Sequence, residues 1–328
     1  MNELKNSRVL ITGGAGLVGS HIADRLASED VSEVVILDNF VRGRMENLAR
    51  AERTLRHLTV INGDITNAET VREAMRGVDF VFHQAALRIT QCAEEPRIAM
   101  ESLIGGTFNV LEAAVDGGVK KVVAASSASV YGEPSYVPMD EAHPFNNRTL
   151  YGACKVADEQ LLRSFNEMYG LPYVALRYFN IYGPRMDAFG VYTEVLIRWL
   201  QRLERGEAPV IFGDGMQTMD FVYIEDVAEA NVRAMKSETS DDVFNVATGV
   251  ETSLRQLCFE LCDAAGRPGM QPLFAEERKV NPVTRRLAAT THAREGIGFT
   301  ASTPLEEGLR RLVAWHARLP KRELVGAR

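Results

Sequence analysis

The chain has 328 residues, more than one compact core usually needs, so we expect one large domain with a smaller lobe attached. A hydrophobic content of 46%, a charged content of 25% and a formal net charge of -7 argue against a general nucleic-acid binder or a membrane-surface protein. The four cysteines lack zinc-like spacing, no metal site is expected, and the polar N-terminus has no signal-like apolar span, which indicates a reduced, cytoplasmic compartment.

The first elements predicted along the chain are a strand, a glycine turn and a helix. Arg8–Thr12 has the apolar run of a buried parallel strand, and residues 20–28 are amphipathic. Between them, Gly13, Gly16 and Gly19 permit a tight turn and a close approach of a diphosphate to the backbone, while the helix N-terminus favours an anion. A flexible turn is the alternative, but this setting predicts dinucleotide binding.

The second predicted strand, Glu33–Asp38, ends on an acid about twenty residues after the glycines. Asp38 is placed to accept hydrogen bonds from both adenosine ribose hydroxyls of NAD and to repel the 2′-phosphate of NADP. Arg42 and Arg44 follow closely and could hold that phosphate, so the sequence favours NAD without excluding NADP.

Strands and helices then alternate in a way that predicts a doubly wound parallel sheet. Further strands are expected at 58–61, 78–83 and 121–125 and from Tyr173 onward, with a long amphipathic helix at Pro96–Asp116. Asp64 and Ile65 follow one strand, beside the expected adenine, and the small residues Ala85 and Ala86 follow another. We therefore predict an α/β, Rossmann-like NAD-binding domain in residues 1–180.

The pattern is less regular after residue 180. We expect helices at 191–205, 224–235 and 253–265, a short strand at 209–212, and a strand at 243–246 that returns to the sheet, so parts of 220–247 rejoin the first domain. A basic loop and two helices are expected in 276–319. Residues 181–328 are thus predicted to form mainly a smaller C-terminal lobe.

The chemical candidates are a serine cluster and a tyrosine–lysine pair. Tyr151 and Lys155 are four residues apart, so they share one helical face, and the ammonium can lower the phenol pKa from its free value near ~10. Tyr151 could then exchange a proton with a substrate hydroxyl. Ser126–Ser129 follows the fifth strand at the carboxyl edge of the sheet, where ligands bind; a hydroxyl-rich turn is the alternative.

In their order along the chain, these segments resemble the extended short-chain dehydrogenase/reductase family, specifically its nucleotide-sugar epimerases and dehydratases. The segments that carry the resemblance are Thr12–Gly19, Asp38-Asn39, Asp64-Ile65, Ser126–Gly132, Tyr151–Lys155, Leu176–Arg185 and Asp220–Asp226. The resemblance covers nearly the whole chain. It implies bound NAD, a nucleoside-diphosphate sugar such as a UDP-sugar in a cleft with the C-terminal lobe, and a homodimer.

The resemblance also implies residue roles. Tyr151 would take the proton of the sugar C4 hydroxyl as hydride passes to the nicotinamide, Lys155 would bind the nicotinamide ribose, and Ser127 would hydrogen-bond the same sugar oxygen. The 4-keto sugar would turn and take the hydride back on its other face. The implied cofactor site comprises Gly13, Gly16, Leu17, Val18, Asp38, Asn39, Asp64, Ile65, Ala85, Ala86, Tyr151 and Lys155. The implied substrate site comprises Arg88, Ser127, Ser129, Asn180, Arg185 and Arg278.

The residues after Ser127 indicate which reaction to expect. Family dehydratases carry Asp-Glu there and related decarboxylases keep the Glu, whereas this chain has Ala128-Ser129. Without a second acid/base pair, a C4 epimerase is favoured over a 4,6-dehydratase. Arg88 and Arg185 could pair with a uronate carboxylate, but solvated or structural arginines are the alternative, so hexose, N-acetylhexosamine and uronate all stay open.

Three positions depart from the family: Leu103 replaces a common Asn, Met219 an Arg, and Ala289 an Asp. They leave a non-catalytic, NAD-binding regulatory protein as an alternative. Relatives place the Arg against the sugar-nucleotide diphosphate, so another cation should replace it. Arg278 is the first candidate, whereas Arg285 and Arg286 are equally consistent with a solvated surface.

The homodimer that the resemblance implies should form through Pro96–Asp116 and the helix that begins near Tyr151, paired into a four-helix bundle. Both segments are long and amphipathic, so apolar surface remains after one stripe covers the sheet. Cover by the chain's own loops is the alternative.

Overall fold

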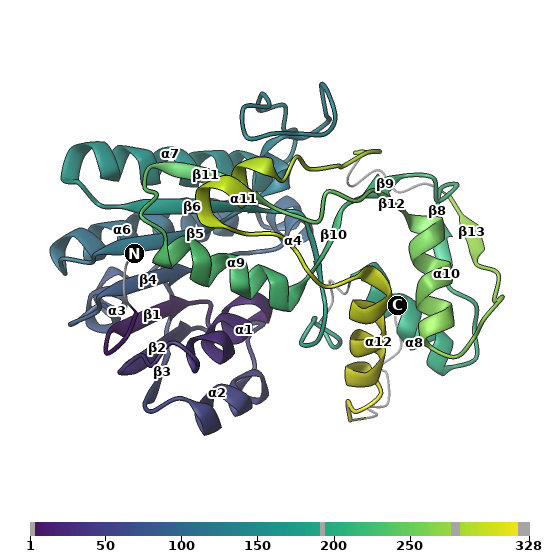
Figure 1. The fold of residues 1–328 in the computed structure, drawn as a ribbon, viewed down its shortest axis with the longest axis horizontal. Coiled ribbons are helices and arrows are strands. Elements are labelled where there is room, and N and C mark those ends of the chain that lie inside the picture. The colour runs from purple at the N-terminus through teal and green to yellow at the C-terminus, as the bar shows by residue number, and fades with distance from the viewer. Residues whose placement is uncertain (1–3, 191–193, 277–282, 321–328) are drawn as a thin grey trace.

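The structure is a computed structural model that describes residues 4–190, 194–276 and 283–320. Figure 1 shows two lobes side by side: a larger one with helices on both faces of a sheet, and a smaller one that contains helices α8, α10 and α12. The start of the predicted helix at 191–205 and the candidate Arg278 lie outside the described residues.

The larger lobe is built on a parallel sheet of seven strands in the order β11-β6-β5-β4-β1-β2-β3. The strands are β1 (Arg8–Thr12), β2 (Glu33–Asp38), β3 (Leu58–Asn62), β4 (Phe80–His83), β5 (Lys121–Ser127), β6 (Tyr173–Tyr178) and β11 (Asp242–Val246). This order confirms the predicted Rossmann-like fold. The direction of strand addition reverses between β1 and β4, and a crevice at the carboxyl ends of the strands is expected at such a point.

Helices cover both faces of the sheet, which is why its inner strands β1, β2 and β4 are mostly apolar and buried. One face carries α1 (Leu17–Leu26), α9 (Ile224–Lys236) and α11 (Thr291–Ile297); the other carries α3 (Ala68–Ala74), α6 (Gly106–Asp116) and α7 (Leu150–Tyr169). Along β1, Val9 and Ile11 belong to the first core and Leu10 to the second. Shorter elements of this lobe are η1 (Met45–Leu48), α2 (Ala49–Thr54), α4 (Ile89–Glu94), α5 (Pro96–Ala99), η2 (Met100–Gly105) and η3 (Ala128–Val130).

The long helix predicted at Pro96–Asp116 is formed by α5, η2 and α6 in succession, and η2 is π-helical. It is the one helix in the described part of the chain that is long and apolar enough to cross a membrane, and 44% of its apolar window is buried inside the fold, as in the core helix of a globular protein. Its apolar character is therefore explained in part by packing.

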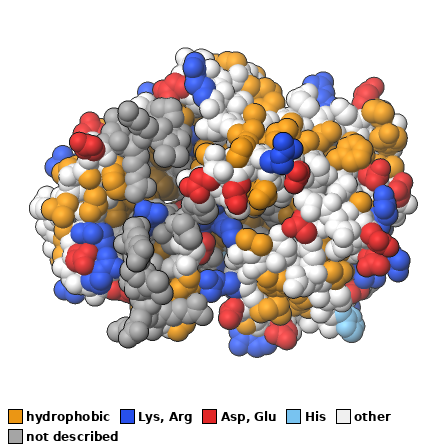
Figure 2. Space-filling model, turned by 180° about the vertical axis from the view of Figure 1, so that it is seen from behind, with side chains coloured by type: hydrophobic (Ala, Val, Ile, Leu, Met, Phe, Trp, Pro, Cys, Tyr) orange, Lys and Arg blue, Asp and Glu red, His pale blue; other side chains and the backbone are white. Residues whose placement is uncertain are grey.

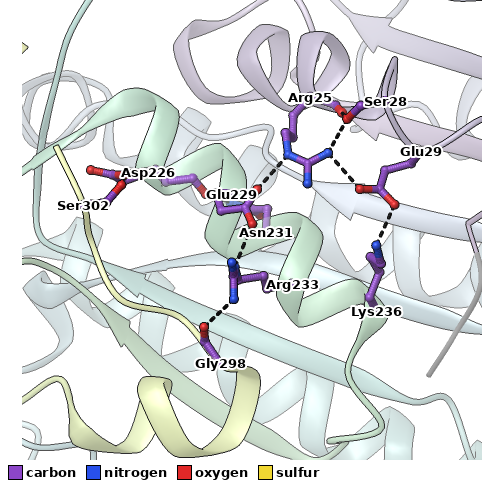
Figure 3. Close-up of polar contacts among 11 residues, drawn as sticks. Arg25, Ser28, Glu29, Asp226, Glu229, Asn231, Arg233, Lys236, Gly298 and Ser302 are labelled. Atoms are coloured by element: carbon purple, nitrogen blue, oxygen red, sulfur yellow. Dashed lines mark hydrogen bonds and ion pairs between the residues drawn. The ribbon is translucent and has the colours of Figure 1, made fainter.

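Helices α1 and α9 are about two hundred residues apart in sequence but pack side by side on the same face of the sheet (Figure 3). Arg25 of α1 lies 2.7 Å from Glu229 and 2.8 Å from Glu29, and Lys236 lies 2.7 Å from Glu29. Arg233 pairs with the same Glu229 at 2.7 Å. Each partly exposed pair contributes about 0.2–1 kcal/mol, so the network adds to the hydrophobic contact between the helices.

The smaller lobe combines helices with two-stranded sheets. Its helices are α8 (Val195–Glu204), α10 (Leu254–Ala264) and α12 (Leu305–His316). The pairs are β7 (Asn180–Tyr182) with β10 (Phe221–Tyr223), β8 (Val210–Phe212) with β13 (Leu273–Ala275), and β9 (Thr218–Met219) with β12 (Thr252–Ser253).

The chain crosses between the lobes several times. β11 lies at the edge of the sheet beside β6, and α9 packs against β5 and β6 of the same sheet. Helix α11 also packs on the sheet lobe, where the His292 ring stacks on Phe244 with centroids 4.6 Å apart. Only the later helix α12 returns to α10. Segments from both halves of the sequence therefore contribute to the larger lobe.

Candidate active site

The glycine turn after β1 is closed so tightly that side chains do not fit. Gly13 has a φ of +64°, and a Cβ on it would lie 2.7 Å from the Ala85 Cα. A Cβ on Gly19 would lie 2.5 Å from the Gly13 carbonyl oxygen. Helix α1 begins at Leu17 with no side chain capping its first turn, so free N–H groups remain there for an anion. This is the geometry that a dinucleotide diphosphate requires.

Asp38, at the end of β2, is held by that same turn. Its carboxylate accepts hydrogen bonds from the backbone N–H groups of Ala15 and Phe40, both at 2.9 Å. Burial raises the pKa of Asp38, and the two hydrogen bonds oppose this rise. A Cβ on Gly43 would come within 2.6 Å of the carboxylate, so the close backbone approach on this side also fixes its position. The Asp38 carboxylate is thus held in one position at the wall of the cleft.

Asn39 and Asp64 form the next part of the wall. The Asn39 amide donates to Asp64 at 2.7 Å, and the other Asp64 oxygen accepts from the Thr66 N–H and hydroxyl. Burial alone would raise the pKa of Asp64, but these hydrogen bonds lower it overall. Ile65 is packed against Gly106 of α6, where a Cβ would lie 2.6 Å from its side chain. The segments that follow β2 and β3 are therefore joined by a side-chain hydrogen bond.

A cleft of about 1480 Å³ lies at the carboxyl edge of the sheet and extends to the smaller lobe. In Figure 2, Lys and Arg side chains gather near the middle of the molecule, where the two lobes meet. The cleft is lined by each predicted cofactor residue, namely Gly13, Gly16, Leu17, Val18, Asp38, Asn39, Asp64, Ile65, Ala85, Ala86, Tyr151 and Lys155. It is also lined by the predicted substrate residues Arg88, Ser127, Ser129, Asn180 and Arg185.

Tyr151 and Lys155 lie in the first turns of α7, which begins after Thr149. The Thr149 hydroxyl accepts from the Gly152 N–H at 3.1 Å and so caps the helix. Lys155 is buried, and its Nζ donates to the Ala125 carbonyl at 2.9 Å and to Asp158 at 3.1 Å. Burial by itself lowers the pKa of Lys155, but electrostatic interactions, with Asp158 first and Tyr151 second, raise this pKa overall. The lysine is therefore held as a cation beneath the tyrosine.

Two further residues behind Lys155 were not found from the sequence. Asp158 is buried and follows the lysine by three residues, so it looks like an ordinary helix-surface acid in the sequence. His83, at the end of β4, is hydrogen-bonded to Thr12 at 2.7 Å and to Thr107 at 2.9 Å. Burial, with a smaller effect of the Lys155 charge, lowers the pKa of His83 to about 3, so the ring is neutral. Neither residue sits in a sequence motif.

The serines that follow β5 have different surroundings. Ser126 donates to Glu159 at 2.5 Å, and Glu159 is paired with the buried Arg177, so Ser126 belongs to the core. Ser127 lines the cleft, and its hydroxyl accepts from the Ser129 N–H at 3.1 Å. Between them in sequence, Ala128 is buried among apolar side chains. No carboxylate follows Ser127 at this edge.

The departures at Leu103 and Met219 have structural explanations. Leu103 is buried in an apolar cluster with Cys92 and Cys154, against which Tyr151 packs. Met219 lies in β9 and does not line the cleft. Its neighbour Asp220 is fully buried and accepts from the Thr248 N–H and hydroxyl and from the Gly249 N–H, so it fixes a loop.

Most of the predicted substrate residues have protein partners. Asn180 donates to the Asp220 carbonyl at 3.2 Å, and Arg88 lies 3.2 Å from Glu194. Arg185 pairs with Asp24 of α1 at 2.6 Å, although its Nη1 is buried without a hydrogen-bond partner. These contacts position the side chains at the rim of the cleft.

The basic run near the C-terminus requires a correction. Arg285 is exposed and pairs with Glu251 at 2.6 Å, as a surface residue would. Arg286 is only 8% exposed and lines the cleft, so a solvated surface position is wrong for it. Adjacent residues of an extended segment point to opposite sides, which the composition of the run does not reveal. Within the described ranges, no group of three or more His, Cys, Asp or Glu side chains is arranged to hold a metal ion.

The fold and the cleft together define a Rossmann-type, dinucleotide-binding protein with a Tyr-Lys pair and a serine beside the cofactor position. The sequence pattern of the NAD dependent epimerase/dehydratase family matches residues 9–247. The chain belongs to this family, and it is an NAD-dependent enzyme of the extended short-chain dehydrogenase/reductase type.

Individual relatives agree over nearly the full length. The chain is 35% identical to a putative UDP-glucose 4-epimerase of Methanocaldococcus jannaschii over 94% of this chain and 97% of that protein. It is 37% identical to the UDP-glucose 4-epimerase of Mycolicibacterium smegmatis over 93% and 97%. The solved UDP-N-acetylglucosamine 4-epimerase of Methanobrevibacter ruminantium, in complex with UDP-N-acetylmuramic acid, superposes with a TM-score of 0.89 at 35% identity and covers 95% of this chain and 99% of that one.

Proposed function

We propose that this enzyme epimerises a nucleoside-diphosphate sugar, with UDP as the nucleotide, at C4. The observation that carries the proposal is the arrangement at the edge of β5 and α7. Ser127, Tyr151 and Lys155 line one cleft with the dinucleotide residues, while the position after Ser127 is a buried alanine instead of an acid. The relatives named as 4-epimerases support the same reaction.

Each of the three residues has a defined task. Bound NAD supplies a hydride acceptor that can return what it accepts. Tyr151 takes the proton of the C4 hydroxyl and later gives one back, and the Ser127 hydroxyl hydrogen-bonds the same oxygen. Lys155 holds the ribose and places a positive charge beside Tyr151. The Lys155 ammonium is anchored by Ala125 and Asp158, so it need not be reorganised during turnover.

A dehydratase is disfavoured by the groups present after Ser127. Elimination of the C6 hydroxyl needs a second acid and base to move the C5 proton. Ala128 cannot transfer a proton, and the Ser129 hydroxyl has an ordinary pKa far above neutrality. Simple oxidation and re-reduction at C4 is the chemistry that the side chains support.

The test is to identify what copurifies with the protein by mass spectrometry, and then to follow UDP-glucose, UDP-N-acetylglucosamine and UDP-glucuronate by NMR without added cofactor. We expect stoichiometric NAD in the purified protein and conversion of at least one sugar to its C4 epimer. A 4-keto-6-deoxy product would identify a dehydratase, and NADH release in step with turnover would identify a net dehydrogenase. Bound NAD with no turnover of any sugar would favour the regulatory alternative.

For the diphosphate, we propose Arg278, which lies outside the described residues, as the cation that replaces the arginine missing at Met219. Two phosphate charges in a partly dry cleft require cationic donors. Arg278→Ala should raise the KM for the sugar nucleotide by about tenfold or more, while the NAD content stays the same. An unchanged KM would place the diphosphate elsewhere.

We further propose a cytoplasmic homodimer that pairs α5, η2 and α6 with α7 of each subunit. Large apolar side chains are exposed on these helices: Ile98, Met100, Phe108, Met168 and Tyr169. Their exposed fractions of 43–67% are high for side chains of this size on two adjacent helices. A second copy of the same surface would cover them.

A further inference from the structure

The segment that carries Arg286 is held by backbone hydrogen bonds to two other parts of the chain. Its N–H donates to the Thr218 carbonyl at 2.9 Å, and the Thr218 N–H donates to the Thr284 carbonyl at 2.9 Å. One residue further on, the Leu287 carbonyl accepts from the Met139 N–H at 2.7 Å. The segment therefore joins β9 of the smaller lobe to the loop after β5. Arg285 points outward to Glu251, so Arg286 points inward.

The Arg286 side chain is buried, and one of its guanidinium nitrogens has no hydrogen-bond partner among the residues that the structure describes. Its Nε is inaccessible to solvent and makes no hydrogen bond with the described residues, although the Glu133 carboxylate acts on the side chain through its charge. Burial lowers the pKa of Arg286 to about 10, with smaller opposing effects from Glu133 and Tyr151, so it stays charged at neutral pH. A buried guanidinium nitrogen that makes no hydrogen bond is costly, and a ligand group that accepts from it would remove that cost.

The position of Arg286 in the cleft indicates which part of a ligand it can reach. It lines the cleft together with Ser129 and Tyr151. A small hollow beside it is lined by Ser129 and by two charged residues, Glu133 and Arg148. Tyr151, the residue assigned to the C4 oxygen, is one of the groups that act on the charge of Arg286. In a pyranose ring C4 lies opposite C1, which carries the diphosphate. Arg286 is therefore closer to the substituents next to C4 than to the phosphates.

We propose that Arg286 binds a carboxylate that the sugar carries on a carbon next to C4, so that the preferred substrate is a nucleoside-diphosphate hexuronate. This inference rests on the proposed function, because it uses the assignment of Tyr151 to the C4 oxygen. A guanidinium presents paired N–H donors that match the two oxygens of a carboxylate. A neutral hexose with CH₂OH at C5 would leave the Arg286 charge uncompensated.

The experiment compares the NAD-loaded protein with two variants, Arg286→Met and the matched control Arg285→Met. Binding of UDP-glucuronate, UDP-glucose and UDP is measured by calorimetry, and turnover of both sugars by NMR. We expect the unmodified protein to bind UDP-glucuronate about tenfold or more tightly than UDP-glucose, as for a charge-assisted hydrogen bond. Arg286→Met should lose about 10- to 100-fold in UDP-glucuronate affinity and less than about threefold for UDP. Arg285→Met should change neither.

Three other outcomes would overturn the inference. Equal affinity of the unmodified protein for UDP-glucuronate and UDP-glucose would mean that the protein does not recognise the carboxylate. An equal loss for both sugars and for UDP in Arg286→Met would assign Arg286 to the diphosphate. The melting temperature of the NAD-loaded protein is compared with that of Arg286→Met, with no sugar nucleotide added. Removing an unpaired buried charge should leave the melting temperature the same or higher, so a lower value for the variant would assign Arg286 a structural role. Failure to turn over either sugar would reject the epimerase, while the binding data would still decide the role of Arg286.

Discussion

At the scale of single residues, Lys155 is held by a partner that spacing does not reveal. Its ammonium lies 3.1 Å from the buried Asp158 and 2.9 Å from the Ala125 carbonyl. The functional pair in the sequence, Tyr151 and Lys155, thus depends on a third residue on the same helix. A lysine without these contacts would lose both its orientation and part of the charge that assists Tyr151.

Substitutions in the catalytic group should separate chemistry from cofactor binding. Tyr151→Phe removes the proton acceptor but little packing, so we expect turnover to be abolished and NAD content to be retained. Lys155→Ala should reduce both, and Ser127→Ala should lower kcat by about 10²-fold, as for one positioned hydrogen-bond donor. NMR turnover and the NAD absorbance of the purified protein measure these effects. Near-normal activity of Tyr151→Phe would show that the base is a different group.

The buried histidines should make folding stability depend on pH. Burial lowers the pKa of both His21 and His83 to about 3. Because these values lie below the unfolded value of about 6.5, the unfolded chain binds more protons between about pH 6.5 and 3. The unfolding free energy should therefore fall as the pH decreases through this window, by about 1.4 kcal/mol per pH unit for each histidine.

Replacing one histidine isolates its share of that dependence. His83→Gln keeps polar groups between Thr12 and Thr107 but cannot take up a proton. Denaturant unfolding between pH 6 and pH 4 should show a shallower decline for the variant, by about 1.4 kcal/mol per pH unit. Parallel curves for the two proteins would contradict the buried, neutral state of His83.

At the scale of elements, the turn from β1 into α1 depends on a helical glycine. A Cβ on Gly19 would lie 2.5 Å from the Gly13 carbonyl oxygen and 2.6 Å from the Gly14 Cα. We predict that Gly19→Ala widens the turn, lowers the melting temperature and reduces the NAD content of the purified protein. Gly105→Ala is the matched control, because Gly105 is also helical and its Cβ would meet nothing within 4 Å. Equal behaviour of the two variants would mean that the turn is not closed as described.

The helix of residues 96–116 illustrates how an element can follow its predicted range and differ in detail. Its bounds agree with the prediction, but residues 100–105 are wound as a π-helix. Leu103 lies in this turn and is buried against Cys92 and Cys154. The wider turn is a feature of packing, which the periodicity of apolar residues does not specify.

At the scale of the whole molecule, the exposed apolar side chains of α6 and α7 predict self-association. Phe108 is 43% exposed and packs edge-on against Phe165 of α7. Phe108→Asp places a charge in the expected interface and should convert a dimer to a monomer, as measured by light scattering at micromolar concentration. Met216→Asp is the control, since Met216 is 61% exposed but lies in the other lobe. A monomeric unmodified protein would dismiss the dimer.

Local sequence by itself determined the fold class, and it indicated most of the residues that line the cleft. Strand, glycine turn and helix are set by neighbouring residues, and the carboxyl ends of parallel strands must share one edge, so Asp38, Asp64 and Ser127 were predicted to line the same cleft. Tyr151 and Lys155 were also indicated by local sequence, because two residues four apart in a helix lie on the same face.

Tertiary structure alone decided which polar side chains are buried and with what partner. His83 meets Thr12 and Thr107 from separate elements, and Arg286 differs from Arg285 only in the side to which an extended segment turns it. The His83 contacts join β1, β4 and α6. The segment that carries Arg286 is hydrogen-bonded to β9 and to the loop that contains Met139. Burial and charge compensation depend on everything that surrounds a group in space, and a linear sequence contains no direct record of that neighbourhood.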